Sequence, residues 1–490
     1  MVATGVVSGL VLGGVLVWPS GSSKPTATAN ILRSAAANTT STAAPTTTTT
    51  LAPTTTTVVT APPTTAPPPP PPPPPTTAPK PTAQRIVPPP PPAPLTFADR
   101  INLAFGGVNG CLVVEENGVI VYERNPTTPF VPASTQKLMV GAAALNRLGP
   151  EYRFETKVVA PQPPGPDGRV ENVWMVGGGD PFLATPDYIG YAASRPRLNT
   201  LALTHLTALA DALVTAGVKD IPGGLYADES RHDTQRSVPT WKPSYVAEAE
   251  VGSLGALTVN SGLAGWGPNQ RVAPDPAASA THALTRLLGE RGVAAAPPGP
   301  APDGSRTAPK DGVVLGSVRS APLADVVAGM MRASDNYAAE MILREIDHNA
   351  GGPGSTAGGA ARVVEDMAAA GVDVAGVHLN DGSGLDTGNR STCRALVGTL
   401  ALAAKPKLGA VIDGLAVAGR SGTLIKRFLG TPVEGRLAAK TGWINGAAGL
   451  AGRLDVPRLR NFALLLNGGF SYAGSSAVQN RVVDVLATTP

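Results

Sequence analysis

A serine and a lysine three positions apart, Ser134 and Lys137, are the first residues whose types and spacing predict chemistry. They follow Pro132 in what we predict to be the first turn of a helix, and positions i and i+3 of a helix lie on one face. A serine hydroxyl needs a nearby base to become a nucleophile. A lysine serves as that base only when burial or a neighbouring cation lowers its pKa. The pair therefore predicts a serine nucleophile, although the same spacing is common among solvated surface residues.

Two later motifs add groups of the same kinds. One supplies a second hydroxyl and a carboxamide, and the other supplies a second amine in a run with the pattern of a β-strand. They are Ser334-Asp335-Asn336 and Lys440-Thr441-Gly442-Trp443. Each also has a structural interpretation, because Ser, Asp and Asn cap helices and lysine protects edge strands. Found together and in this order, the three motifs predict a single catalytic cleft.

The composition excludes several other classes of function. The 490 residues carry 39 basic and 35 acidic side chains, a formal net charge of +4, without a basic cluster interleaved with aromatic residues. Nucleic-acid binding therefore has no support. The five histidines are scattered and the two cysteines lack metal-ligand spacing, so we expect no metal site and no cofactor.

The two cysteines, Cys111 and Cys393, leave two alternatives open. In an exported protein they could form a disulfide, which would stabilise the fold by at most about 5 kcal/mol in the chain-entropy model. Otherwise they are two buried free thiols.

The N-terminus predicts export. Residues Met1 to Trp18 form an uncharged, largely apolar run, which is marginal in length for a membrane span and acceptable as a signal-peptide core. We expect a membrane anchor or signal segment at residues 1–19, with an uncleaved anchor favoured. Both alternatives place the protein outside the cytoplasm, anchored to the cell membrane or secreted into the cell wall.

Residues 20–95 predict a spacer. They are almost entirely Thr, Pro, Ala and Ser, including the unbroken prolines Pro67 to Pro75. Such a segment cannot bury enough apolar surface to fold, and its prolines favour extended polyproline II. At about 3.1 Å per residue, a fully extended tract reaches on the order of 200 Å.

Folded sequence begins near Thr96. Asn117-Gly118 predicts a hairpin between strands at 111–115 and 119–122, and Gly149-Pro150 ends the helix that carries Ser134. Helix and strand patterns then alternate at 201–218, 224–228 and 276–291, which indicates an inserted α/β domain. Helical patterns flank Ser334-Asp335-Asn336, and another follows at about 392–404. Three antiparallel strands at 435–441, 448–454 and 462–466 precede a closing helix at 477–486.

The three motifs occur with further glycine-rich ones: Val176-Gly177-Gly178-Gly179-Asp180-Pro181, Asp381-Gly382-Ser383-Gly384-Leu385 and Gly419-Arg420-Ser421-Gly422-Thr423-Leu424. From Thr96 onward the sequence resembles the D-alanyl-D-alanine carboxypeptidases of class C low-molecular-mass penicillin-binding proteins, the peptidase S13 family. The resemblance implies an α/β (α+β) β-lactamase/transpeptidase-like fold. Its antiparallel sheet is flanked by helices, with a helical subdomain and an inserted α/β domain.

The resemblance sets the expected boundaries at residues 96–155 and 301–490 for the catalytic domain and 156–300 for the insert. One departure is visible. After Asn260 the chain passes within a few residues to the helix near Pro276, where the family continues into further β-rich sequence. We therefore expect one inserted domain rather than two.

The resemblance also implies roles for the motif residues. Ser134 would attack the penultimate D-Ala carbonyl of a peptidoglycan stem peptide, Lys137 would accept its proton with Lys440 as the neighbouring cation, and Ser334 would relay a proton to the leaving nitrogen. Asn336, Lys440, Thr441, Gly442 and Trp443 would bind substrate. Of these, Lys440 and the Thr441 hydroxyl would hold the free C-terminal carboxylate. The backbone N–H groups of Ser134 and Trp443 would stabilise the oxyanion.

The expected partners are peptidoglycan stem peptides and, as acylating inhibitors, β-lactams. An endopeptidase that cuts cross-links remains an alternative, since its substrate also presents a D-Ala carbonyl. A β-lactamase is less favoured because no Glu-x-x-Leu-Asn-like stretch supplies a deacylating base. A wall-binding protein without turnover is a further alternative. A Ser-His-Asp hydrolase lacks its Gly-x-Ser-x-Gly motif.

Overall fold

The computed structural model describes residues 66–73, 94–301, 304 and 306–489. The apolar run at residues 1–18 and most of the predicted spacer at 20–95 lie outside these ranges. The contacts divide the chain into two units, Met1–Pro89 and Pro90–Pro490. Residues 66–73 of the first unit have exposed side chains and neither helix nor strand.

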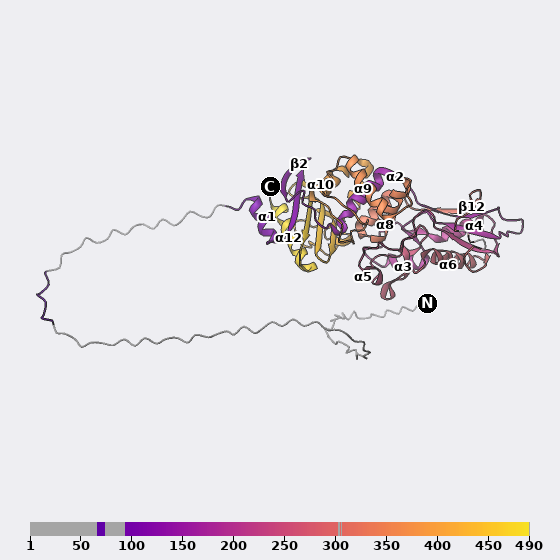
Figure 1. Ribbon diagram of the computed structural model, residues 1–490, viewed down its shortest axis with the longest axis horizontal. Coiled ribbons are helices and arrows are strands. Elements are labelled where there is room, and N and C mark those ends of the chain that lie inside the picture. The colour runs from indigo at the N-terminus through magenta and orange to yellow at the C-terminus, as the bar shows by residue number, and fades with distance from the viewer. Residues whose placement is uncertain (1–65, 74–93, 302–303, 305, 490) are drawn as a thin grey trace, which may run out of the picture. The chain divides into compact units, whose positions relative to one another are not determined.

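The described part of the second unit contains a six-stranded antiparallel sheet (Figure 1). Its strands, in spatial order, are β13 (Ala416–Val417), β14 (Leu437–Ile444), β15 (Ala447–Asp455), β16 (Leu459–Asn467), β1 (Gly110–Glu116) and β2 (Val119–Arg124). The first described strand, β1, thus pairs with the last, β16, with Gly110 opposite Leu466. This confirms the predicted antiparallel sheet and the hairpin at Asn117-Gly118.

The two faces of the sheet bury different sets of side chains, as the twofold period of a strand requires. In β1, Leu112 and Val114 join a core with α1 (Phe97–Phe105) and α12 (Tyr472–Thr488). Cys111 and Val113 point to the opposite face, into the larger core. Helices therefore cover both faces, and the predicted fold class is confirmed.

Five helices of ten or more residues pack in the larger core. They are α2 (Lys137–Leu148), α7 (Leu323–Ala333), α8 (Asn336–Asn349), α9 (Thr356–Ala369) and α10 (Cys393–Leu402). Helix α8 is buried from Tyr337 to Asp347. A helix that is buried on all sides is held by its surroundings, so its first turn is a rigid place for a functional side chain.

A second sheet lies in the segment between the first two motifs and extends to residue 319. Its four strands, in spatial order, are β12 (Val313–Arg319), β3 (Glu155–Ala160), β4 (Asn172–Val176) and β8 (Gly224–Asp228). Helices α4 (Leu206–Thr215) and α6 (Pro276–Gly289) contribute leucines to its core. The sheet is mixed, because β4 and β8 run parallel and the other pairs are antiparallel. The boundaries and number of inserted domains stay a prediction.

The remaining helices and strands of the described residues are short. The strands are β5 (Leu183–Ala184), β6 (Thr204–His205), β7 (Asp220–Ile221), β9 (Leu263–Gly265), β10 (Arg271–Val272) and β11 (Ala294–Ala295). The α-helices are α3 (Pro186–Ala193), α5 (Pro243–Ala247) and α11 (Ala410–Asp413). The 3-10 turns are η1 (Ala133–Gln136), η2 (Asn260–Gly262), η3 (Gly267–Asn269), η4 (Pro406–Leu408) and η5 (Gly422–Leu424).

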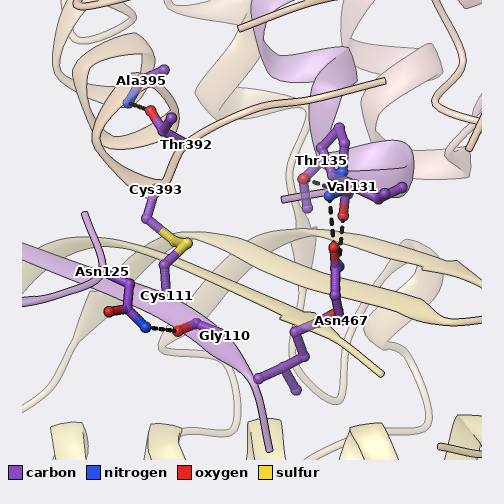
Figure 2. Close-up of a disulfide and its surroundings, with 11 residues drawn as sticks. Gly110, Cys111, Asn125, Val131, Thr135, Thr392, Cys393, Ala395 and Asn467 are labelled. Atoms are coloured by element: carbon purple, nitrogen blue, oxygen red, sulfur yellow. Dashed lines mark hydrogen bonds between the residues drawn. A yellow bond between two sulfur atoms is a disulfide. The ribbon is translucent and has the colours of Figure 1, made fainter. Parts of the chain in front are cut away.

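Cys111 and Cys393 form a disulfide that ties β1 to the first residue of α10 (Figure 2). Of the two alternatives left open by the sequence, the paired one is correct. Thr392 caps the same helix end, where its hydroxyl accepts from the backbone N–H of Ala395. The disulfide and the cap together fix the start of α10 over the sheet.

Several predicted elements differ at their ends. The predicted helix at 201–218 begins only at Leu206, and α9 was not predicted. Helix α2 ends at Leu148, before Gly149 with its positive φ of 87°, as expected. Within the described residues, no single helix is long and apolar enough to cross a membrane. The segments Cys393–Leu402 and Pro406–Asp413, which are bent relative to one another, reach that length and composition only when they are taken together.

Candidate active site

Ser134 lies in η1, the 3-10 turn immediately before α2, rather than in the first turn of the α-helix itself. The turn begins at Ala133 with φ 47°, a left-handed conformation that is strained for a residue with a side chain. Strand β14 passes very close to it. A Cβ atom at Gly442 would lie 2.9 Å from the Pro132 carbonyl oxygen and 3.0 Å from the Ser134 nitrogen. Glycine at position 442 is therefore needed for the strand to approach the serine.

The predicted hydroxyl and amine are in contact. Lys137 Nζ lies 2.9 Å from Ser134 Oγ and donates a second hydrogen bond to Asn336 Oδ1, also 2.9 Å away. Lys137 is fully buried, whereas Ser134 and Asn336 are partly exposed. A dry amine beside an accessible hydroxyl is the arrangement that proton removal from serine requires.

A backbone carbonyl completes the environment of this amine. The Ser383 carbonyl oxygen accepts from Lys137 Nζ at 2.6 Å and from Ser134 Oγ at 3.2 Å. The turn that presents it is held by two buried carboxylates. Glu340 accepts from the backbone N–H groups of Gly382 and Ser383, and Asp381 accepts from those of Gly384 and Asp386.

The electrostatics favour a lysine that can lose its proton. Burial lowers the pKa of Lys137 from its usual value to about 8. The carboxylates of Asp381, Glu340 and Asp335 oppose that shift, and the Arg197 guanidinium adds to it. Desolvation is therefore the main cause, as expected for an ammonium group removed from water.

Ser334 and Lys440 form a second hydroxyl and amine pair. Lys440 Nζ donates to Ser334 Oγ at 2.6 Å and to the Thr441 carbonyl oxygen at 2.8 Å. Lys440 is also fully buried, and its pKa is lowered by burial first and then by the charge of Lys137. The charge of Lys137 thus acts on Lys440, whereas the cation that lowers the pKa of Lys137 is Arg197 and not the Lys440 that we predicted.

The helix-capping interpretation of Ser334-Asp335-Asn336 is confirmed, and the catalytic one stays a prediction. Ser334 ends α7 in a left-handed conformation with φ 57°. Asp335 caps α8, where its carboxylate accepts from the backbone N–H of Ala338. The sharp turn between the two helices is what places Ser334 and Asn336 on the cleft.

The two pairs open onto one cleft of about 580 Å³. The predicted residues that line it are Ser134, Ser334, Asn336, Thr441 and Trp443, while Lys137 and Lys440 lie buried beneath their hydroxyl partners. The Thr441 hydroxyl donates to the Thr423 hydroxyl, which also lines the cleft. Among the described residues, no group of His, Cys, Asp or Glu could hold a metal ion.

The sequence profile of the D-Ala-D-Ala carboxypeptidase 3 (S13) family matches residues 104–269 and 267–489. The chain belongs to this family. A D-alanyl-D-alanine carboxypeptidase of Actinomadura sp. is 30% identical to this S13 chain over 458 residues, 78% of this chain and 81% of the relative. A carboxypeptidase of Mycobacterium tuberculosis is 32% identical over 397 residues, 78% of this chain and 80% of the relative.

The solved structure of penicillin binding protein 4 from Haemophilus influenzae has the same fold as this S13 chain. The TM-score is 0.67 at 20% sequence identity, with 81% of this chain and 100% of that chain covered. At this identity the likeness concerns the fold alone.

Some parts of the candidate site are backbone groups and buried carboxylates, and the sequence did not predict them. The Asp381-Gly382-Ser383 motif was visible as a turn, but a carbonyl that accepts from Lys137 is not encoded by a side-chain type. Glu340 follows Asn336 by four positions, one helical turn, and that spacing was a usable signal. Arg197 does not belong to any of the motifs in the sequence.

Proposed function

We propose that this protein is a serine-type D-Ala-D-Ala carboxypeptidase that removes the terminal D-alanine from peptidoglycan stem peptides through an acyl-enzyme. The observation that carries the proposal is the contact of 2.9 Å between Ser134 Oγ and the fully buried amine of Lys137. Membership of the S13 family and the names of its curated relatives support the substrate class.

In the acylation step, Ser134 Oγ bonds to the carbonyl carbon of the penultimate D-Ala. The hydroxyl proton passes to the neutral amine of Lys137. The oxyanion that forms is stabilised by the backbone N–H groups of Ser134 and Trp443, and losing one such donor typically costs about 10² to 10³ in rate. The close approach of Gly442 to Ser134 supports this pairing of donors.

The intermediate then collapses, and the bond between the carbonyl carbon and the nitrogen of the terminal D-Ala breaks. Ser334 relays a proton to that nitrogen, which its hydrogen bond with Lys440 supports. Asn336 holds Lys137 in place through its side-chain oxygen and contacts the substrate amide. Water hydrolyses the resulting ester on Ser134 and restores the serine hydroxyl. No step requires a metal or an organic cofactor.

β-Lactams are proposed inhibitors, because their strained amide presents a carbonyl beside a carboxylate, as the substrate does. The penicillin binding protein 4 of Haemophilus influenzae, which shares the fold, has been solved in complex with a β-lactam. A site of action outside the cytoplasm agrees with this substrate and with the Cys111–Cys393 disulfide, since disulfides persist in oxidising compartments. We propose attachment to the membrane through the N-terminal apolar run, with residues 20–95 as the spacer.

The test is the release of free D-alanine from defined muropeptides by the full-length protein. A monomeric pentapeptide should lose one D-Ala, and Ser134→Ala should abolish the release. The products are identified by mass. If the wild-type protein cleaved only cross-linked dimers, as an endopeptidase would, the proposal would be contradicted. Penicillin labelling without any D-Ala release would indicate a wall-binding protein instead.

A further inference from the structure

Arg197 brings a charge to the cleft from a segment outside the three motifs. It lies between α3 and β6, and its Nη2 donates to the Ala333 carbonyl oxygen at 2.7 Å, one residue before Ser334. It lines the same cleft as Ser134 and Thr441. Its side chain is exposed, and none of the ion pairs found among the described residues involves it. Arg197 is thus a solvent-facing cation fixed at one end beside the reacting groups.

The two lysines of the site are poorly placed to serve as anchors for an incoming anion. Both are fully buried. The amine of Lys137 already donates to Ser134, Asn336 and Ser383, and that of Lys440 to Ser334 and Thr441. Burial also lowers the pKa of each amine, so each holds its positive charge less firmly than an exposed lysine does. An arginine, in contrast, keeps its charge at all relevant pH values.

We infer that Arg197 binds the free C-terminal carboxylate of the substrate and so makes the enzyme selective for a chain end. This inference rests on the proposed function and assigns to Arg197 the charge-pairing role that the family resemblance implied for Lys440 beside the Thr441 hydroxyl. The guanidinium is planar and can pair with both carboxylate oxygens, and the bond to Ala333 holds it in one orientation. The buried lysines remain free to transfer protons.

Two other cations reach the cleft, and the structure separates them from Arg197. The guanidinium of Arg195 stacks on the ring of Tyr191, 4.9 Å from its centroid. Lys426 is exposed and lines the cleft, but no hydrogen bond among those of the described residues joins it to the Ser334 segment. Lys426 is therefore the rival anchor that an experiment must exclude.

The experiment compares two substrates, a stem peptide ending in D-Ala-D-Ala with a free carboxylate and the same peptide with a C-terminal amide. For the full-length Arg197→Gln variant, kcat/KM for the free acid should fall about 10- to 100-fold, the usual worth of a hydrogen bond to a charged group. Most of that loss should be in KM. The amide should be hydrolysed with the kcat/KM of the wild type, so the variant should lose its preference for the free acid. Arg197→Lys should retain part of the preference.

The matched controls are Arg286→Gln, which removes an exposed arginine of α6 paired with Glu290, and Lys426→Gln. Arg286→Gln should leave both rates unchanged, and Lys426→Gln should keep the preference. Saturating labelled penicillin counts intact active sites in each preparation. The inference would be overturned if Arg197→Gln kept the preference for the free acid or lost activity equally on both substrates. Loss of that preference in Lys426→Gln would also overturn it. Failure of the wild type to release D-Ala would instead reject the proposed function.

Discussion

At the scale of single residues, the site depends on keeping an amine dry. Lys137 is fully buried, and three carboxylates within electrostatic range favour its charged form, yet its pKa is still lowered to about 8. Desolvation therefore outweighs the nearby negative charges. In the proposed mechanism the neutral amine accepts the serine proton, so a measurable share of the protein would be competent near neutral pH.

This balance predicts how acylation depends on pH. A base with a lowered pKa becomes active as it loses its proton, so the rate constant for acylation by a β-lactam should rise with pH and level off above about 8. Well below that value it should fall about tenfold per pH unit. The measurement is the second-order rate constant from about pH 6 to about pH 10. A rate that stays constant across this range would contradict the role of Lys137.

At the scale of elements, glycine decides how closely the sheet approaches the serine. Gly442 in β14 faces the Ser134 turn, and at Gly449 in β15 a Cβ would lie 2.6 Å from a methyl carbon of Thr135. Asn467 at the end of β16 fastens the preceding loop by pairing with the backbone of Val131 (Figure 2). The position of Ser134 is thus set by three strands that follow it in sequence by about three hundred residues.

The disulfide supplies a prediction at this scale. It closes a loop of 282 positions between β1 and α10, and in the chain-entropy model so long a loop contributes at most about 5 kcal/mol to the free energy of unfolding. Reduction should therefore lower the denaturant midpoint of the wild type. The Cys111→Ala/Cys393→Ala double variant should start lower and not respond to reductant. Equal midpoints for the oxidised and reduced wild type would contradict this contribution.

The elements also show what the sequence could predict. The hairpin at Asn117-Gly118 and the end of α2 at Gly149 were predictable because each depends on a local backbone preference. The 3-10 turn at Ser134 was not, because its conformation is imposed by β14 rather than by its own residues. Pairing of the two cysteines was likewise open until the fold placed β1 beside α10.

At the scale of the whole molecule, the segment between the first two motifs is part of the site. The Trp241 indole donates to the Asp381 carboxylate, which holds the turn that presents the Ser383 carbonyl. The Asn336 amide donates to the Glu250 carbonyl oxygen. Arg197 comes from the same segment. The sequence motifs contain the proposed reacting groups, but long-range contacts that no motif marks complete their surroundings.

The proposed mechanism requires the Ser134 hydroxyl to be the nucleophile, and labelled penicillin tests this requirement most directly. We predict a covalent adduct on the full-length wild-type protein, mapped by mass spectrometry to the peptide containing Ser134, and none on Ser134→Ala. The absence of an adduct on the wild type, or an undiminished adduct on Ser134→Ala, would contradict the assignment of Ser134 as the nucleophile.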